Sequence, residues 1–226
     1  MTRKTSNPAT LAVIGGTGAE GGGLALRWAA AGHRVIIGSR DSAKAAAAAG
    51  ELRALLPAGS GRLEGAASGA AAKEAAVVVL TVPFAAQMTT ALALKPVLGG
   101  KILVDVTVPL VPPKVSTVQL PAGGSCVAQV QKELGPGVRV VSAFQNVSAH
   151  KLKKLEQAIA CDVLVCADDK EARERVIELA ADAGLRGINA GPLANSAAAE
   201  ALTSLLIWIN RAYKVPDAGI AITGLG

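Results

Sequence analysis

The sequence contains few aromatic side chains: its 226 residues include two Trp, two Phe and one Tyr. A surface that binds nucleic acid combines clustered basic residues with aromatic rings on which bases stack. The net charge of +6 fits a polyanionic partner, but the basic residues are scattered along the chain. We therefore expect no nucleic-acid partner. A phosphate-rich small molecule explains the charge equally well, as does a merely solvated basic surface.

Cysteine and long apolar runs are also scarce. The three cysteines form no C-x-x-C pair, and they are read as free buried thiols in a reducing compartment. The most apolar late stretch, 191–210, is interrupted by polar residues and is too polar for a bilayer span of about 20 residues. The first ten residues are polar and lack the apolar segment of a secretory signal. We expect a cytoplasmic protein that does not associate with membranes.

Small aliphatic residues are abundant, and hydrophobic residues make up 51% of the chain. Short β-branched runs alternate with alanine-rich, helix-like stretches, and the runs lack the strict polar alternation of a half-exposed strand. The predicted strands are 11–14, 34–37, 77–82, 102–106, 138–141 and 162–165. This rhythm predicts an α/β protein, a Rossmann-type doubly wound fold with a mainly parallel sheet.

The second half of the chain departs from this rhythm. Residues 107–124 contain four prolines and are predicted to form a long irregular loop. A helix is expected from about residue 170 to 183, a short strand near 185–189, and a long apolar helix over about 195–213. The sequence therefore predicts a small helical annex at the C-terminus.

The first predicted strand leads into a glycine-rich turn, 16–21, that matches the pattern G-x-G-x-x-G. Gly16 permits the tight turn, Gly18 lets a pyrophosphate approach the backbone, and Gly21 lets the helix pack on the strand. The free N–H groups at the start of the helix would face the phosphates. Because the turn lies between a strand and a helix, a dinucleotide site is favoured over glycines that serve only as a turn. The candidate cofactor-binding residues here are Gly16, Thr17, Gly18, Ala19 and Glu20.

The end of the second predicted strand indicates which dinucleotide binds. A site that selects NAD places an Asp or Glu there to bind the ribose 2′-hydroxyl, whereas this chain has Ser39 and Arg40. A hydroxyl and a guanidinium bind a 2′-phosphate through charge-assisted hydrogen bonds, and Lys44 would add a second cation one helical turn on. The sequence therefore predicts NADP, the alternative being an Arg that merely starts a solvated helix.

Two more loops follow strands at the edge where the cofactor should lie. We expect Thr81, Val82, Pro83 and Val106 to contact the cofactor, with Pro83 shaping the loop over the nicotinamide ribose. Phe84 fits this loop or the edge of the core equally well.

These motifs resemble a known family. The segments GGTGAEGGGLALRWAAAGHRVIIGSR, LTVPF, DVLVCADDKEARERV and AGPLANSAAAEALTSLL are similar to the NADPH-dependent coenzyme F-420 reductases, the F-420H2:NADP oxidoreductases, from about residue 11 to 222. The resemblance implies hydride transfer between the nicotinamide of NADP and an 8-hydroxy-5-deazaflavin, coenzyme F-420. It demands no catalytic nucleophile and no metal, and it implies a homodimer.

The resemblance also implies an NADP-binding Rossmann domain over 1–145 and a C-terminal part, 146–226, that completes the acceptor pocket and forms the dimer interface. The implied substrate-binding residues are Pro109, Gln145, Asn146, Ser148, Leu193, Asn195 and Thr203. Family members are expected to have His at the position of Gln145, so this chain keeps a polar contact there but not a titratable one. Asn195 and Ser196 have a plain alternative as helix caps.

Two other functions stay open at this point. One is an NADPH-dependent reductase of a different acceptor, such as a flavin, an imine or a ferric complex. The other is a non-catalytic module that senses NADP, in which the phosphate-binding turn persists while the acceptor side is closed.

Overall fold

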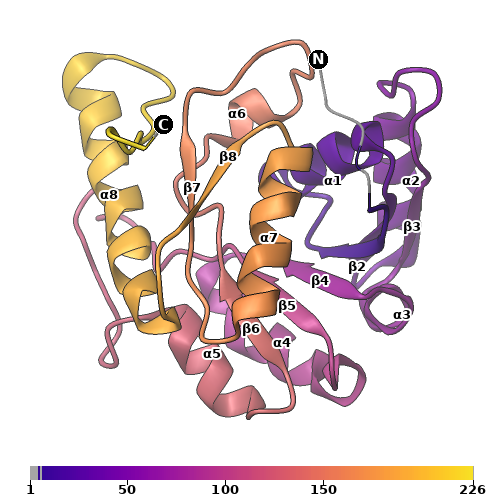
Figure 1. Ribbon diagram of the computed structural model, residues 1–226, viewed down its shortest axis with the longest axis horizontal. Coiled ribbons are helices and arrows are strands. Elements are labelled where there is room, and N and C mark those ends of the chain that lie inside the picture. Colours follow the sequence, from indigo (N-terminus) through magenta and orange to yellow (C-terminus); the bar gives the residue numbers. More distant parts are fainter. Residues whose placement is uncertain (1–4, 6, 226) are drawn as a thin grey trace.

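The computed structural model describes Thr5 and residues 7–225. Its main feature is a six-stranded parallel sheet in the order β3-β2-β1-β4-β5-β6 (Figure 1). The strands are β1 (Thr10–Ile14), β2 (Arg34–Ser39), β3 (Leu63–Ala67), β4 (Val77–Leu80), β5 (Ile102–Asp105) and β6 (Arg139–Ser142). The predicted Rossmann-type doubly wound sheet is confirmed.

Helices cover both faces of this sheet. One face carries α1 (Ala19–Ala31), α2 (Ser42–Arg53) and α7 (Lys170–Asp182), and the other carries α3 (Ser68–Glu74), α4 (Phe84–Leu98) and α5 (Cys126–Leu134). Successive residues of β1 alternate between the two cores: Leu11 and Val13 face the first, Ala12 and Ile14 the second. Both faces are apolar because both are buried, which is why the strand runs lack polar alternation.

The sequence analysis missed β3. Its sequence, LEGAA, lacks the β-branched residues that marked the other strands. It contains Gly65, where an added Cβ would overlap the backbone of Ala45 in α2, so a glycine is required for helix and strand to pack this closely. A glycine required by a distant helix is not visible as a strand signal in the local sequence.

The C-terminal part contains α6 (Ala149–Leu152), β7 (Asp162–Val165), β8 (Arg186–Asn189), a 3₁₀ turn η1 (Leu193–Asn195) and α8 (Ser196–Tyr213). The segment 162–165 is a strand as predicted, but it pairs with β8 in a separate two-stranded parallel sheet. An antiparallel bridge between Ser142 and Cys166 connects this small sheet to the end of β6. The predicted C-terminal helix is confirmed as α8, which stands at one edge of the molecule (Figure 1), and the two-stranded sheet packs beside it in the same annex.

The loop predicted over 107–124 contains no helix or strand. Cys126, Cys161 and Cys166 are free and buried, as expected. Within the described residues, no helix has the length and apolarity needed to cross a bilayer.

Side chains from the second half of α1 join it to the C-terminal part. Arg27 is 2% exposed. Its Nε donates to the carbonyl of Leu152 at 2.7 Å, and its Nη1 donates to the carbonyl of Ala183 at 3.0 Å. Its Nη2 donates to the carbonyls of Lys151, Lys154 and Gln157. One guanidinium thus bonds to five backbone carbonyls, and its bonds to Leu152 and Ala183 are buried.

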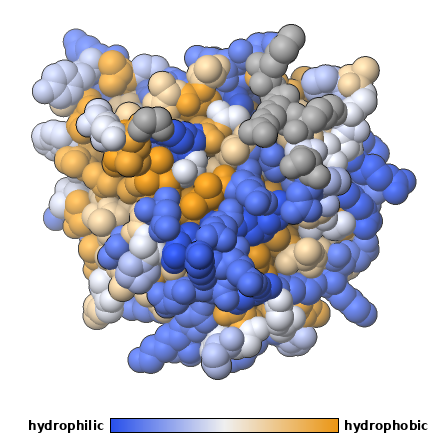
Figure 2. Space-filling model, in the orientation of Figure 1, coloured by the Kyte–Doolittle hydropathy of each residue, from blue (hydrophilic) through white to orange (hydrophobic). Residues whose placement is uncertain are grey.

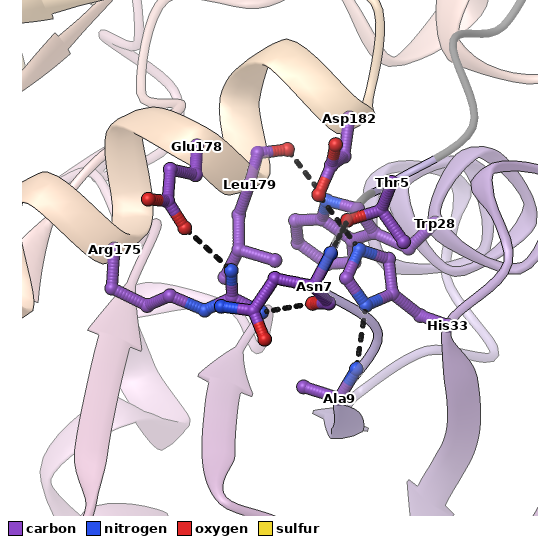
Figure 3. Close-up of polar contacts among 9 residues, drawn as sticks. All are labelled: Thr5, Asn7, Ala9, Trp28, His33, Arg175, Glu178, Leu179 and Asp182. Atoms are coloured by element: carbon purple, nitrogen blue, oxygen red, sulfur yellow. Dashed lines mark hydrogen bonds and ion pairs between the residues drawn. The ribbon is translucent and has the colours of Figure 1, made fainter.

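A second set of contacts joins α7 to α1 and to the turn after it (Figure 3). Trp28 Nε1 donates to the carbonyl of Leu179 at 2.8 Å. The buried His33 accepts the N–H of Ala9 at Nδ1, so Nε2 carries the proton and donates to Asp182 Oδ2 at 2.9 Å. Desolvation lowers the pKa of His33, although Asp182 opposes that shift. His33 therefore has a structural role where α7 meets the turn after α1.

Candidate functional site

A cleft of about 550 Å³ opens at the carboxyl ends of β1, β2, β4 and β5. Its volume falls in the range of small-molecule sites, and its position is the one where open parallel sheets bind ligands. The predicted cofactor-binding residues that line it are Thr17, Gly18, Ala19, Glu20, Ser39, Arg40, Thr81, Val82, Pro83 and Val106. Gly16 and Lys44 do not line it.

The glycine-rich turn forms one wall. The N–H of Gly18 donates to the carbonyl of Gly15 at 2.9 Å, which closes the turn before α1 begins. An added Cβ at Gly21 would overlap Thr81 Oγ1 and lie 2.8 Å from the Cα of Gly16. Gly16 itself packs against Ile37, which explains why it lies under the cleft rather than in its lining. No side chain caps the start of α1, so its first N–H groups are left for a ligand.

The end of β2 forms the second wall, with Arg40 exposed to the cleft. The carboxylate of the neighbouring Asp41 accepts the N–H groups of Ala43 and Lys44 and so caps α2. Because Asp41 is engaged in this way and no described acidic residue forms an ion pair with Arg40, the guanidinium remains available for an anion. The residues therefore suit a phosphate at this end of the cleft.

The opposite end of the cleft is mostly apolar. It is lined by Val82, Pro83, Phe84, Val106, Val108 and Leu110. Pro83 lies at the start of α4, and Thr81 Oγ1 donates to the carbonyl of Ile14 at 2.9 Å, which fixes the loop after β4 beside the glycine-rich turn. Phe84 lines the cleft and also packs on the second core, so both of its predicted roles apply.

A buried carboxyl group, which the sequence analysis did not single out, holds the loop after β5. Asp105 Oδ1 accepts the N–H of Thr107 at 2.9 Å, and Oδ2 accepts from Gln87 Nε2 at 2.7 Å. Burial raises the pKa of Asp105 to about 6, while the bonds from Thr107 and Gln87 act in the opposite direction. Asp105 thus fixes the backbone that presents Val106 and Thr107 to the cleft.

Glu200 is a second buried carboxylate that the sequence analysis did not assign to any site. It accepts from Ser125 Oγ at 2.6 Å and from the N–H of Cys126 at 2.8 Å, and it lies at the N-terminus of α5. A charge at a helix N-terminus is stabilised by the helix dipole and by the free N–H groups. α8 is therefore attached to α5 by the only acidic residue in its own sequence.

The predicted acceptor residues form a hydrogen-bonded group beside the cleft. Gln145 Nε2 donates to the carbonyl of Asp105 at 2.8 Å, and Thr203 Oγ1 donates to the carbonyl of Gln145 at 2.8 Å. Asn146 Nδ2 donates to the carbonyl of Ala199 and to Thr203 Oγ1. Gln145 Oε1 is buried without a partner among the described residues. These side chains join the segment after β6 to α8.

The other predicted acceptor residues are dispersed. Ser148 donates to Asp217 at 3.1 Å, and Asn195 donates to the carbonyl of Ala190 at 2.7 Å. Leu193 is buried in the second core. Pro109 lies between Val108 and Leu110, which both line the cleft.

A doubly wound parallel sheet with a glycine-rich first turn and a cleft at its switch point defines a Rossmann-class dinucleotide-binding protein. The family model described as NADP oxidoreductase, coenzyme F420-dependent, matches residues 10–109. The F420-dependent NADP reductase of Methanothermobacter thermautotrophicus is 41% identical over 95% of this chain and 95% of its own length. The enzyme of the same name from Methanocaldococcus jannaschii is 41% identical over 95% of this chain and 98% of its own.

A crystal structure from Arthrobacter sp. FB24, assigned to the F420-dependent NADP reductases, has a TM-score of 0.75 and 27% identity, and the match covers 95% of this chain and 100% of that one. The chain belongs to the F420-dependent NADP reductase family, a family of NADP-dependent oxidoreductases.

Proposed function

We propose that this protein transfers a hydride between NADP(H) and the 8-hydroxy-5-deazaflavin coenzyme F420. The observation that carries the proposal is one continuous cleft with a glycine-rich turn and Arg40 at one end and an apolar wall at the other. The names of the relatives, which match over nearly the whole chain, support the choice of both substrates.

In this proposal the turn from Gly16 to Glu20 binds the cofactor pyrophosphate. The N–H groups of Gly16 and Gly18 are bonded to the carbonyls of Val13 and Gly15, so the N–H groups of Thr17, Ala19 and Glu20 are the proposed donors. Ser39 and Arg40 bind the 2′-phosphate, and Lys44, in the first turn of α2, completes the positive charge around it. Thr81, Val82, Pro83 and Val106 lie against the nicotinamide ribose. This arrangement favours NADP over NAD because a 2′-phosphate offers Arg40 a charged partner that a hydroxyl does not.

Hydride transfer requires two stacked rings at near-attack distance and little water between them. The apolar residues after β4 and β5 suit this requirement, and positioning supplies most of the catalysis without a nucleophile or a metal. The acceptor residues Pro109, Gln145, Asn146, Ser148, Leu193, Asn195 and Thr203 are proposed to act at the far side of this wall. Of these, Gln145, Asn146 and Thr203 position the wall through their mutual bonds.

The proposed division separates residues 1–145, which hold NADP, from 146–226, which complete the acceptor side. The six-stranded sheet lies wholly within the first range. Residues 1–4, 6 and 226 of these ranges lie outside the described residues.

We also propose a homodimer formed through α8. Trp208 is 59% exposed and Tyr213 76% exposed, and Leu205 and Val215 are exposed nearby. Figure 2 shows hydrophobic surface gathered on the side of the molecule where α8 and the chain's end lie in Figure 1. Contiguous exposed apolar surface of this kind marks protein–protein contacts. The three buried thiols support a location in the cytoplasm, as proposed from the sequence.

The test of the proposed reaction mixes purified protein with NADPH and oxidised deazaflavin and follows the visible absorbance of the deazaflavin. We expect turnover with the deazaflavin and little with FMN or FAD in parallel reactions. Tight NADPH binding without deazaflavin reduction would contradict the proposed acceptor while leaving the NADP site intact.

A further inference from the structure

Ser68 is a residue of the cleft to which neither the sequence motifs nor the proposed function gives a role. It is the first residue of α3 and follows β3 directly. It lines the cleft together with Ser39 and Arg40. Because β3 lacks a strand signal in the sequence, a ligand-binding residue at the end of this strand was not predicted.

The register of the sheet places Ser68 beside the end of β2. Ser39, the last residue of β2, pairs in parallel with Ala67, the last residue of β3. Both segments therefore leave the sheet at the same edge, about 5 Å apart. Arg40 and Ser68 are the next residues of the two segments, so both stand at the edge that forms the cleft.

A glycine allows the start of α3 to approach β2 this closely. An added Cβ at Gly38 would lie 3.2 Å from the Cα of Ser68 and 2.5 Å from the Cδ1 of Ile14. A side chain at this position would therefore press on both neighbours. With glycine here, the backbone of Ser68 lies directly against the backbone of Gly38, and the two residues line one cleft.

The hydroxyl group of Ser68 is available to a ligand. The residue is half-buried, and among the described residues no group forms a hydrogen bond with this hydroxyl. The hydroxyl oxygen of Ser39 accepts the N–H of Asp41 at 3.2 Å and keeps its own proton for a ligand. One hydroxyl donor thus stands at the end of each of the two strands.

The acidic side chains of β3 and α3 are engaged away from this edge. Glu64 of β3 and Glu74 of α3 each pair with Arg34 at 2.8 Å. Arg34 is the first residue of β2, so this network lies at the opposite edge of the sheet from Ser39. The charge beside Ser68 is therefore that of Arg40, which attracts an anion.

We propose that Ser68 binds the 2′-phosphate of NADP(H) and thereby helps to select NADP(H) over NAD(H). A phosphate monoester presents three oxygens that accept hydrogen bonds. The Ser68 hydroxyl donates to one of them from the β3 side, while Ser39 and Arg40 donate from the β2 side. The inference rests on NADP(H) binding in the proposed function, and it is independent of which molecule accepts the hydride.

The experiment measures the affinities of NADPH and NADH by cofactor fluorescence for the wild type and three variants. Ser68→Ala loses a hydrogen bond to a charged group, so the Kd for NADPH should rise about tenfold and the Kd for NADH less than about twofold. Ser68→Thr keeps the hydroxyl and should stay within about threefold of the wild type for both cofactors. Ser60 lies in the loop before β3 and does not line the cleft, so Ser60→Ala should bind both cofactors as the wild type does.

Two results for Ser68→Ala would overturn the proposal. Equal losses for NADPH and NADH would place the hydroxyl against a part that the two cofactors share, and an unchanged Kd for NADPH would mean that it makes no contact. A wild type that binds both cofactors equally would also overturn the 2′-phosphate site of the proposed function. A wild type that prefers NADPH, with no selective loss in Ser68→Ala, would overturn this inference alone.

A second variant reverses the sign of the interaction. Ser68→Asp places a carboxylate where the proposal puts the phosphate, and an Asp at the start of a helix is well tolerated. Because like charges repel, the Kd for NADPH should rise about 100-fold and the Kd for NADH less than about threefold. Equal effects on the two cofactors would overturn the proposal even if Ser68→Ala fails to fold. Since all of these measurements report binding, failure of the protein to reduce a deazaflavin would not be mistaken for failure of this inference.

Discussion

The two ends of α1 differ in how they use their side chains. The first turn is nearly free of side chains, and its backbone N–H groups face a cleft. The second half carries Arg27 and Trp28, which bond to carbonyl groups of the C-terminal part. One helix therefore combines an end that is open to a ligand with an end that is fixed by the protein. The comparison indicates that stability and cofactor affinity should respond to different residues of the same helix.

The fixed end should show the largest effect. Arg27→Ala would leave the buried carbonyls of Leu152 and Ala183 without a donor and would remove three partly buried bonds, and we expect it to lower the free energy of unfolding by about 3–5 kcal/mol. Chemical denaturation measures this change. Arg211→Ala is the control, because exposed Arg211 makes a single bond to Ser116 and its loss should cost less than about 0.5 kcal/mol. Similar losses for both variants would contradict the role given to Arg27.

The open end should respond in affinity more than in stability. Gly21→Ala would push a methyl group into Thr81 and Gly16, so the turn must shift. Its N–H groups would then no longer point at the position of the bound phosphate. We expect NADPH affinity to fall about 30- to 100-fold, with a loss of about 1–3 kcal/mol in stability. Gly50→Ala on α2 has open space and should stabilise the protein by about 0.5–1 kcal/mol without changing affinity. Unchanged binding in Gly21→Ala would argue against this turn as the phosphate site.

At the cleft beside the open end of α1, Arg40 should distinguish NADPH from NADH in affinity. Because a charge-assisted bond is worth about 1.5–3 kcal/mol, Arg40→Ala should weaken NADPH about 10- to 100-fold and NADH less than threefold. Affinities for both cofactors, measured side by side, test this difference. Equal losses would mean that Arg40 does not bind the 2′-phosphate.

His33, in the turn after the fixed end of α1, should have the smallest effect, and only in acid. Since its pKa is lowered in the folded protein, the unfolded chain binds the proton first as the pH falls. The contribution of His33 to stability is therefore complete above about pH 6.5 and declines below it, by at most about 1.4 kcal/mol per pH unit. Thermal melts between pH 7 and 5 should show a shallower decline for His33→Gln than for the wild type. His150→Gln, at an exposed position, should follow the wild type; a wild-type slope in His33→Gln would refute the assignment.

The features that sequence could predict are those whose cause is local. The helix after Asp169 begins where its carboxylate caps the N–H of Ala172, and the glycine-rich turn lies between its strand and helix as expected. The burial of β-branched runs on both faces also follows from composition.

What could not be predicted depends on contacts between distant segments. In the sequence, Glu200 only interrupts an otherwise apolar helix. Its role becomes visible in the structure, where α8 packs against α5 and Glu200 binds the N–H of Cys126, 74 residues away in sequence. Arg27 lies in an apolar stretch, and nothing near it indicates that its partners follow more than 120 residues later. The bonds of Gln145 and Asn146 to the backbone of β5 and α8 are equally invisible in their own sequence.

The bonds of Arg27 also have a consequence for how the chain folds as it is made. α1 is synthesised well before its partners, since the guanidinium of Arg27 finds its acceptors only when residues 151–157 and Ala183 have been made. Contacts of such long sequence separation form late, since their closure entropy must be overcome first. Until residue 183 has been made, the phosphate-binding turn therefore lies on a helix whose Arg27 is solvated by water and not bonded to its protein acceptors. A turn that is competent to bind the cofactor should consequently form after residue 183 has been made and not when α1 itself emerges.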